Sequence, residues 1–133
     1  MNNGDNIIQK IDYSKLSKEF VKYFYDNWML NPNVFFQSNI FSNYTRLRVD
    51  DIIYDGVNVV KYLEYIWKCG NLKIEVVNIN SLDSGSRRID TIASGNIYKD
   101  NKIYIYSQYF LLLYVKDTWI LQNSILNINE RKL

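Results

Sequence analysis

The chain has 133 residues, which suits one domain, and 47% of them are hydrophobic, which excludes a largely disordered chain. Its 16 basic and 14 acidic residues are too evenly balanced for a dedicated nucleic-acid-binding protein. A single cysteine excludes an internal disulfide framework and fits a reducing compartment.

The first residues differ in composition from the rest of the chain. Residues 1–10 are polar and rich in Asn and Gly, so we expect a flexible N-terminal tail without the apolar core of a secretion signal. No linker or repeat divides the remainder, which predicts one domain over residues 11–130. No stretch approaches the ~20 apolar residues that a membrane span requires.

The first predicted element is a helix from Tyr13 to about Met29, because apolar side chains recur there at spacings of three and four residues. This stripe consists of Leu16, Phe20, Tyr23, Phe24 and Trp28. The pair Asn31-Pro32 is typical of a helix start, which predicts a short second helix from Val34 to about Phe41.

A hairpin and a third helix follow. Residues 44–49 alternate in polarity, and Asp50-Asp51 separates them from a second short strand over residues 52–54, which indicates a tight hairpin. Helical spacing resumes from Val59 to Trp67 and ends at Cys69-Gly70, with Gly70 as the left-handed cap.

The remaining chain is predicted as four strands separated by polar turns. Their ranges are 72–80, 87–98, 103–115 and 118–128. The predicted order is therefore helix, helix, two strands, helix, four strands, which is an α+β domain.

The strand over residues 103–115 is apolar on both faces, whereas an antiparallel sheet normally keeps one face polar. Three helices cover only one face, so we expect the other face to meet a second subunit in a dimer. The residues predicted for that interface are Tyr104, Tyr106, Phe110 and Leu112. The alternative is a central strand that curls tightly over its own helices.

The chain lacks the residues of the common catalytic and metal sites. With no histidine, it has no Ser-His-Asp triad, no Cys-His pair and no His-based zinc site. It contains no Gly-rich phosphate loop, and the acidic cluster of Asp50, Asp51 and Asp55 is typical of turn formation. We therefore expect no enzyme activity, no metal and no cofactor.

One residue keeps an enzymatic alternative open. Asp90 lies in the middle of a predicted strand, and a buried carboxylate beside a tyrosine can serve as a general base. In this alternative the protein is a small-molecule binder, isomerase or dehydratase that uses an internal cavity, and Asp90 acts there. The other interpretation is that Asp90 pairs with a neighbouring arginine such as Arg88.

Four stretches resemble the nuclear transport factor 2 family and lie in that family's order between about residue 11 and residue 128. They read I-D-Y-S-K-L-S-K-E-F-V-K-Y-F-Y, Y-D-G-V-N-V-V-K-Y-L, Y-S-Q-Y-F-L-L and W-I-L-Q-N-S-I-L-N-I. The resemblance implies a nuclear transport factor 2-like, or cystatin-like, cone: a strongly bent antiparallel sheet wrapped around three helices.

The resemblance also implies a non-enzymatic transport factor of the cytoplasm and nucleus that acts at the nuclear envelope and pore. Such a protein forms a homodimer and binds the Ran GTPase in its GDP form and the Phe-Gly repeats of nucleoporins. By position, Asp50 and Asp100 match an acidic rim that contacts Ran, and Tyr13 matches an aromatic residue that contacts the repeats.

The sequence departs from the family pattern at three places. Val49 replaces an aromatic residue, Asn101 or Lys102 replaces a second turn acid, and Asn123 to Ile128 lack the family's closing Phe and Arg. An alternative is therefore a partner subunit, in a heterodimer, of a messenger-RNA export receptor, or another scaffold of the same fold.

Overall fold

The computed structural model describes residues 12–68, 71–83 and 87–132. The predicted tail over residues 1–10, Cys69 with the predicted cap at Gly70, and the turn residues 84–86 lie outside the described residues. Elsewhere the predicted order of helices and strands is confirmed. The elements are α2 Tyr13–Leu30, α3 Pro32–Phe35, β1 Arg46–Val49, β2 Ile52–Asp55, α4 Val57–Lys68, β3 Leu72–Asp83, β4 Arg88–Lys99, β5 Lys102–Val115 and β6 Thr118–Glu130.

Helix α2 begins at a side-chain cap that the apolar spacing alone does not indicate. The Asp12 carboxylate accepts a hydrogen bond from the Lys15 backbone N–H at 3.1 Å, which satisfies one of the free donors of the first turn. The predicted stripe is buried at Phe20, Phe24 and Trp28, whereas Tyr23 is largely exposed. The buried face of α2 is wider than the prediction because it also includes Ser17, Val21 and Tyr25.

Helix α3 is a single turn, shorter than the predicted helix from Val34 to Phe41. The ring of Phe35 packs against Phe24 at 5.0 Å and against Phe41 at 5.2 Å between centroids. In a continuous helix, residues 35 and 41 would point about 120° apart. The chain therefore turns after α3, which brings both rings into one aromatic cluster.

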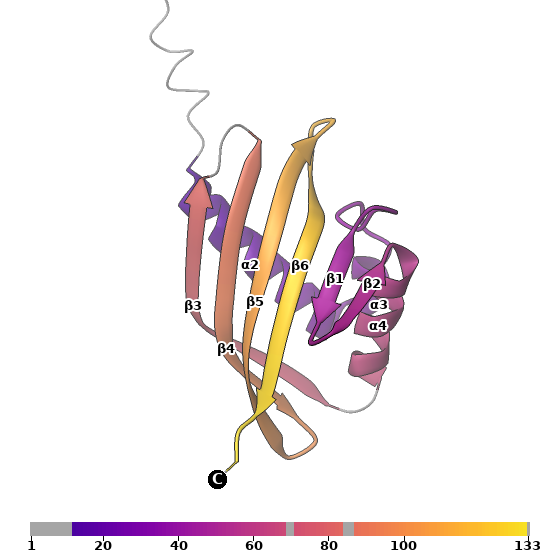
Figure 1. Cartoon of the computed structure of the whole chain (residues 1–133), viewed down its shortest axis with the longest axis vertical. Coiled ribbons are helices and arrows are strands. Elements are labelled where there is room, and N and C mark those ends of the chain that lie inside the picture. Colours follow the sequence, from indigo (N-terminus) through magenta and orange to yellow (C-terminus); the bar gives the residue numbers. More distant parts are fainter. Residues whose placement is uncertain (1–11, 69–70, 84–86, 133) are drawn as a thin grey trace, which may run out of the picture.

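The six strands form one sheet in the order β2-β1-β6-β5-β4-β3. Neighbouring strands are antiparallel except β1 and β6, which are parallel and so depart from the wholly antiparallel sheet that the sequence suggested. Figure 1 shows the curved sheet with α2 lying across one face and α3 and α4 beside β1 and β2. We call the face toward α2 the inner face and the opposite one the outer face.

The bend of the sheet has a local cause at Gly95. A Cβ atom on Gly95 would lie 1.9 Å from the Glu75 carbonyl oxygen, so no larger residue fits at this crossing of β3 and β4. Opposite Gly95, the pairing register of β3 shifts between Val76 and Asn78, which is a β-bulge. Bulges increase twist and bend the strand, so this pair of features curves β3 and β4 around the helices.

The inner face of β5 belongs to the core of the protomer, which corrects the predicted dimer interface. Tyr106 is 2% exposed and Phe110 is fully buried, with rings that contact Tyr25 at 5.7 Å and Phe20 at 5.6 Å. Leu112 is also fully buried, and Tyr104 is partly buried against the same core. These four residues therefore do not form a surface for a second subunit. The alternative that β5 curls over the chain's own helices explains its inner face.

Candidate functional site

Several elements end at one edge of the cone, where the two predicted rim acids lie. Asp50 lies in the β1–β2 turn and Asp100 in the β4–β5 turn, with φ values of 53° and 50°. Because β1 is parallel to β6 and β5 is antiparallel to it, both turns lie at the same end of the sheet (Figure 1). Both acids are exposed, and both shape tight turns, because Asp tolerates positive φ.

An apolar hollow of about 140 Å³ opens at this end, and we call it the mouth hollow. It is lined by Trp28, Ile66, Leu72, Ile97, Lys99, Tyr104 and Ile128. These residues come from the ends of α2, α4, β4 and β6 and the starts of β3 and β5. The indole Nε1–H of Trp28 donates to the Leu63 carbonyl at 3.2 Å, which fixes one wall of the hollow.

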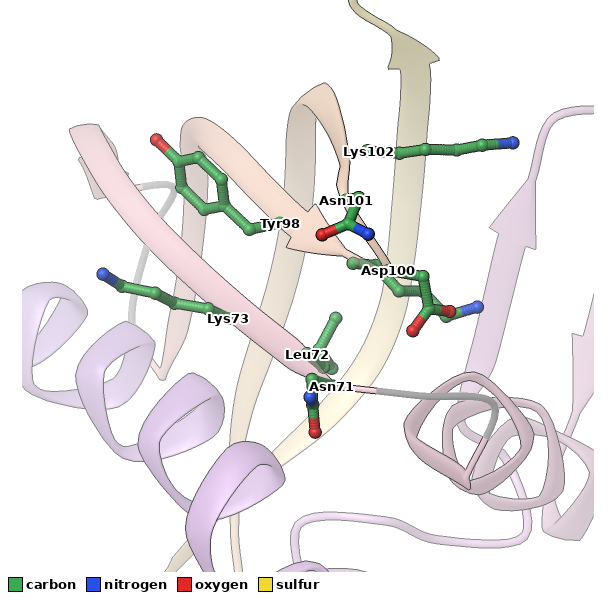
Figure 2. A pocket seen from close by; sticks show the side chains of 8 residues that line it. Asn71, Leu72, Lys73, Tyr98, Asp100, Asn101 and Lys102 are labelled. Atoms are coloured by element: carbon green, nitrogen blue, oxygen red, sulfur yellow. The ribbon is translucent and has the colours of Figure 1, made fainter.

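A second depression, of about 360 Å³, lies at the start of β3 and the β4–β5 turn, and we call it the lysine groove. It is lined by Asn71, Leu72, Lys73, Tyr98, Lys99, Asp100, Asn101 and Lys102 (Figure 2). Leu72 and Lys99 line both depressions, so the two are neighbours at this end of the sheet.

The charge of the lysine groove differs from the predicted acidic rim. Three lysines, Lys73, Lys99 and Lys102, line it together with the single carboxylate of Asp100, and the Lys73 ammonium lies 5.8 Å from the centre of the Tyr98 ring. The β1–β2 turn keeps two acids, Asp50 and Asp51, of which Asp51 lies 3.9 Å from an Arg48 guanidinium nitrogen. The lysine groove is therefore basic, and the acidic β1–β2 turn is separate from it.

Tyr13, the third predicted contact residue, is not part of this site. It is the first residue of α2, which begins beside the far end of β3 in Figure 1, whereas the mouth hollow lies where β3 starts. Its side chain is partly buried against the core. The three predicted partner residues are thus divided between two ends of the molecule.

The interior of the cone holds a hydrogen-bonded network of uncharged side chains. The Tyr25 hydroxyl donates to Gln108 Oε1 at 2.7 Å, Gln108 Nε2 donates to Ser124 Oγ at 2.9 Å, and Ser124 Oγ donates to the Tyr109 carbonyl at 2.7 Å. Burial raises the pKa of Tyr25 well above its usual value, so its hydroxyl stays protonated. The sequence pattern does not predict this network, because Gln108 is only a polar interruption of an apolar strand.

Asp90 lies on the outer face of the sheet, outside the cone. Its carboxylate accepts hydrogen bonds from the Arg88 guanidinium at 3.2 Å and from the Tyr109 hydroxyl, which confirms the predicted pairing with Arg88. The hydrogen bonds to Asp90 raise the pKa of Arg88, and burial is the main cause that raises the pKa of Tyr109. Asp90 is therefore part of a surface ion pair.

The outer face carries a row of side chains across five strands, and four of these side chains are apolar. Ile53, Ile125, Tyr109 and Ile92 follow one another through the register of β2, β1, β6, β5 and β4, with Arg48 between the first two. A groove of about 250 Å³ lies on this face, lined by Arg46, Arg48, Ile53, Tyr109, Leu111, Asn123, Ser124 and Ile125. Ile92 and Ile125 are 49% and 40% exposed, so the face is apolar and uncovered in the protomer.

The described part of the chain contains neither a cluster of metal ligands nor a membrane-spanning helix. No three His, Cys, Asp or Glu side chains among residues 12–68, 71–83 and 87–132 gather as ligands for a metal ion. Within the same residues, no helix is both long enough and apolar enough to cross a membrane.

Comparison with known proteins identifies the fold. No protein-family model and no curated protein sequence matches the chain. Among solved structures, nuclear transport factor 2 from Cryptosporidium parvum superposes with a TM-score of 0.78 at 17% identity over 88% of this chain and 94% of its own. The yeast Ubp3-associated protein Bre5 gives 0.76 at 16% identity over 92% of this chain and 100% of its own.

A third similar structure is a candidate scytalone dehydratase from Novosphingobium aromaticivorans. It superposes with a TM-score of 0.71 at 11% identity over 90% of this chain and 89% of its own. Proteins with different assigned roles therefore share this architecture, which separates fold from function. The chain has the nuclear transport factor 2-like fold.

Proposed function

We propose that this protein is a non-catalytic docking subunit that binds a protein partner at the mouth of the cone. The observation that carries the proposal is the mouth hollow, an apolar depression beside a groove lined by lysines and Asp100. Apolar pockets supply affinity, and charges around them supply orientation and specificity. The buried polar residues among those described are Ser17, Thr45, Thr91, Gln108 and Ser124, which are all uncharged.

The docking subunit is further proposed to be a homodimer that pairs through the outer face. Exposed apolar patches of several hundred Å² usually mark interfaces, and this face combines exposed isoleucines with arginines and asparagines. A stable interface of this kind buries on the order of 2,000 Å² in total. The proposal keeps the predicted dimer and moves its interface from the inner to the outer face.

The finer proposal is that the partner at the mouth is Ran in its GDP form and that Phe-Gly repeats bind beside Tyr13. The protein would then act in the cytoplasm and at the nuclear pore. The support for this proposal is the sequence resemblance, together with the acidic β1–β2 turn, which lies toward the same end of the sheet as the mouth hollow. A partner side chain in the mouth hollow would bring its neighbouring basic residues toward Asp50 and Asp51.

Calorimetric titration of the full chain with Ran-GDP tests this proposal. We expect wild-type protein to bind and Asp50→Lys to bind about tenfold more weakly, because a like charge then faces the basic partner. Asp26→Lys removes an acid from the exposed side of α2 and serves as the control with the same change of charge. Absence of heat with the wild-type protein would exclude Ran as the partner.

A second candidate function is that of a subunit in another protein assembly. Bre5, one of the similar structures, is named as a Ubp3-associated protein. The lysine groove favours this candidate, because Lys73, Lys99 and Lys102 place positive charge where the resemblance to a Ran carrier implies acids. The sequence resemblance suggests a messenger-RNA export receptor as the partner in such a heterodimer. Co-purification of the chain with such a receptor, at equal stoichiometry and without self-association, would favour this candidate.

A further inference from the structure

A further depression lies at one edge of the sheet, between β2 and α4, and we call it the edge groove. It has a volume of about 550 Å³ and shares no lining residue with the mouth hollow. Its lining residues are Ile53, Tyr54 and Asp55 of β2 and Asn58, Lys61, Tyr62 and Tyr65 of α4. The α4 residues recur at spacings of three and four, so they form one face of that helix.

The edge groove follows the free edge of β2. Among the described residues, β2 is the last strand of the sheet and pairs only with β1. Successive side chains of a strand point to opposite faces. The groove is lined by Ile53, which lies on the outer face, and also by Tyr54, whose ring stacks on that of Tyr62 at 4.5 Å between centroids. A depression that is lined from both faces of an edge strand runs along that edge.

The backbone of β2 directs hydrogen-bonding groups toward this groove. The Gly56 N–H donates to the Thr45 carbonyl at 2.8 Å, which makes these residues a hydrogen-bonded pair of the β1–β2 hairpin. Hydrogen-bonded and non-hydrogen-bonded pairs alternate along an antiparallel ladder. Tyr54, two residues before Gly56, therefore also bonds to β1, whereas the N–H and C=O of Ile53 point away from β1.

We propose that the edge groove binds an extended segment of a partner protein, which adds a strand to β2 through the backbone groups of Ile53. Exposed strand edges are templates for such pairing, and the side chains of the added strand provide specificity. Asp55 already pairs with Arg46 at 2.7 Å, so Lys61 is the lining charge that an acidic side chain of the segment can pair with. The tyrosine rings of α4 offer apolar contact beside it.

The proposed segment is therefore extended and apolar, with an acidic residue on the side that faces α4. This inference goes beyond docking at the mouth, because it concerns a separate groove and a different mode of recognition, in which backbone hydrogen bonds provide affinity.

Amide hydrogen exchange of the full chain tests the inference with a capped synthetic peptide, Thr-Val-Leu-Val-Glu. In a strand its valines lie on one face, beside Ile53, and its leucine and glutamate lie on the other, toward α4. At saturating peptide we expect exchange of the Ile53 amide to slow by at least about tenfold. The Tyr54 amide should change much less, because it already donates to β1.

Two methylated peptides test the backbone contact. One carries a methyl group on both valine nitrogens, and the other carries methyl groups on the leucine and glutamate nitrogens. A residue that pairs with Ile53 has its side chain on the same face, so the valine N–H groups point toward β2. We expect the first peptide to bind at least about tenfold more weakly than the second.

Variants of the chain locate the binding. Ile53→Pro removes the N–H that points away from β1, whereas Ile53→Ala removes the same side chain contacts and keeps the N–H. We expect Ile53→Pro to bind the peptide at least about tenfold more weakly than Ile53→Ala. Lys61→Glu should weaken the peptide, and lysine in place of the peptide's glutamate should restore binding. Lys18→Glu, at an exposed site on α2, is the control with the same change of charge, and a melting curve verifies that each variant is folded.

Three outcomes would overturn the inference: no binding of the unmodified peptide at millimolar concentration, equal binding of the two methylated peptides, or equal affinity of Ile53→Pro and Ile53→Ala. Protection of the Ile53 amide that rises with concentration of the chain alone would also refute it, in favour of edge pairing between two copies. Titration with Ran-GDP reports on the mouth hollow, so failure at the edge groove is distinguishable from failure of the proposed function.

Discussion

At the scale of single residues, two buried tyrosines with similar surroundings have opposite roles in stability. The Tyr25 hydroxyl is the donor that satisfies Gln108 Oε1, whereas the buried Tyr106 hydroxyl has no hydrogen-bond partner of regular geometry among the described residues. Removing one partner of a buried hydrogen bond costs the desolvation free energy of the group left behind, and removing an unsatisfied hydroxyl does not.

Tyr25→Phe is therefore expected to lower the free energy of unfolding by about 1–3 kcal/mol, because it leaves the Gln108 carbonyl unpaired. Tyr106→Phe is expected to leave stability unchanged or to increase it. Urea denaturation of both variants and the wild type measures the difference. An equal loss in the two variants would show that Tyr106 is hydrogen-bonded in solution.

At the scale of elements, the curvature of the sheet depends on one glycine and one bulge. Gly95→Ala places a Cβ atom against the Glu75 carbonyl, which is backbone and cannot rotate away. We expect a loss of about 1–3 kcal/mol, as for other overpacking substitutions, measured by thermal or urea unfolding. Ser94→Ala, at the neighbouring half-buried position on the same strand, is the matched control, and an equal effect there would contradict this explanation.

The sequence predicts helices and strands well wherever apolar residues recur at a regular spacing over a short stretch. The three-and-four spacing of Phe20, Phe24 and Trp28 predicted α2 to within a residue of its end. The alternation of side chains does not show which face of β5 points toward the helices, because both faces of this strand are apolar. Helix α2 decides it by packing on Tyr106 and Phe110, which is a long-range contact.

The candidate site was predictable only in part, for the same reason. Asp50 and Asp100 were placed at one end of the sheet by the family resemblance, and the strand directions bring both turns to that end. Lys73 and Lys99 were not predicted as part of the groove that contains Asp100, because Lys73 joins it only through the pairing of β3 with β4. Such pairing depends on the whole sheet and not on local spacing.

At the scale of the whole molecule, the proposed dimer depends on the outer face. Ile125→Lys places a charge in the middle of the exposed row, so we expect monomers where the wild type forms dimers at micromolar concentration. Sedimentation equilibrium measures both. Leu30→Lys, at an exposed site at the end of α2, is the control, and a wild-type protein that is monomeric would contradict the prediction.

Buried tyrosines also make stability depend on pH in the alkaline range. Burial raises the pKa of Tyr62 and of Tyr106 from 10.0 to about 12, and it raises the pKa of Tyr25 as well. Between pH 10 and 12, the unfolded chain therefore binds fewer protons than the folded chain, so stability falls as pH rises. Urea midpoints measured from pH 8 upward are expected to be level and then to decline above about pH 10.

Tyr62→Phe provides the comparison for that series, because it removes one raised group at a partly buried position. We expect its decline above pH 10 to be shallower than that of the wild type. Identical slopes would show that Tyr62 titrates in the folded protein as it does in the unfolded chain.

Docking at the mouth of the cone is tested most directly by the methyl spectrum of labelled isoleucines during titration with Ran-GDP. Isoleucines sample each surface separately: Ile66, Ile97 and Ile128 line the mouth hollow, whereas Ile92 and Ile125 lie on the outer face. We expect a binding partner to shift the methyl signals of the three isoleucines in the mouth hollow and to leave those of the two outer-face isoleucines in place. Binding that shifts Ile92 and Ile125 while the mouth signals stay fixed would contradict it.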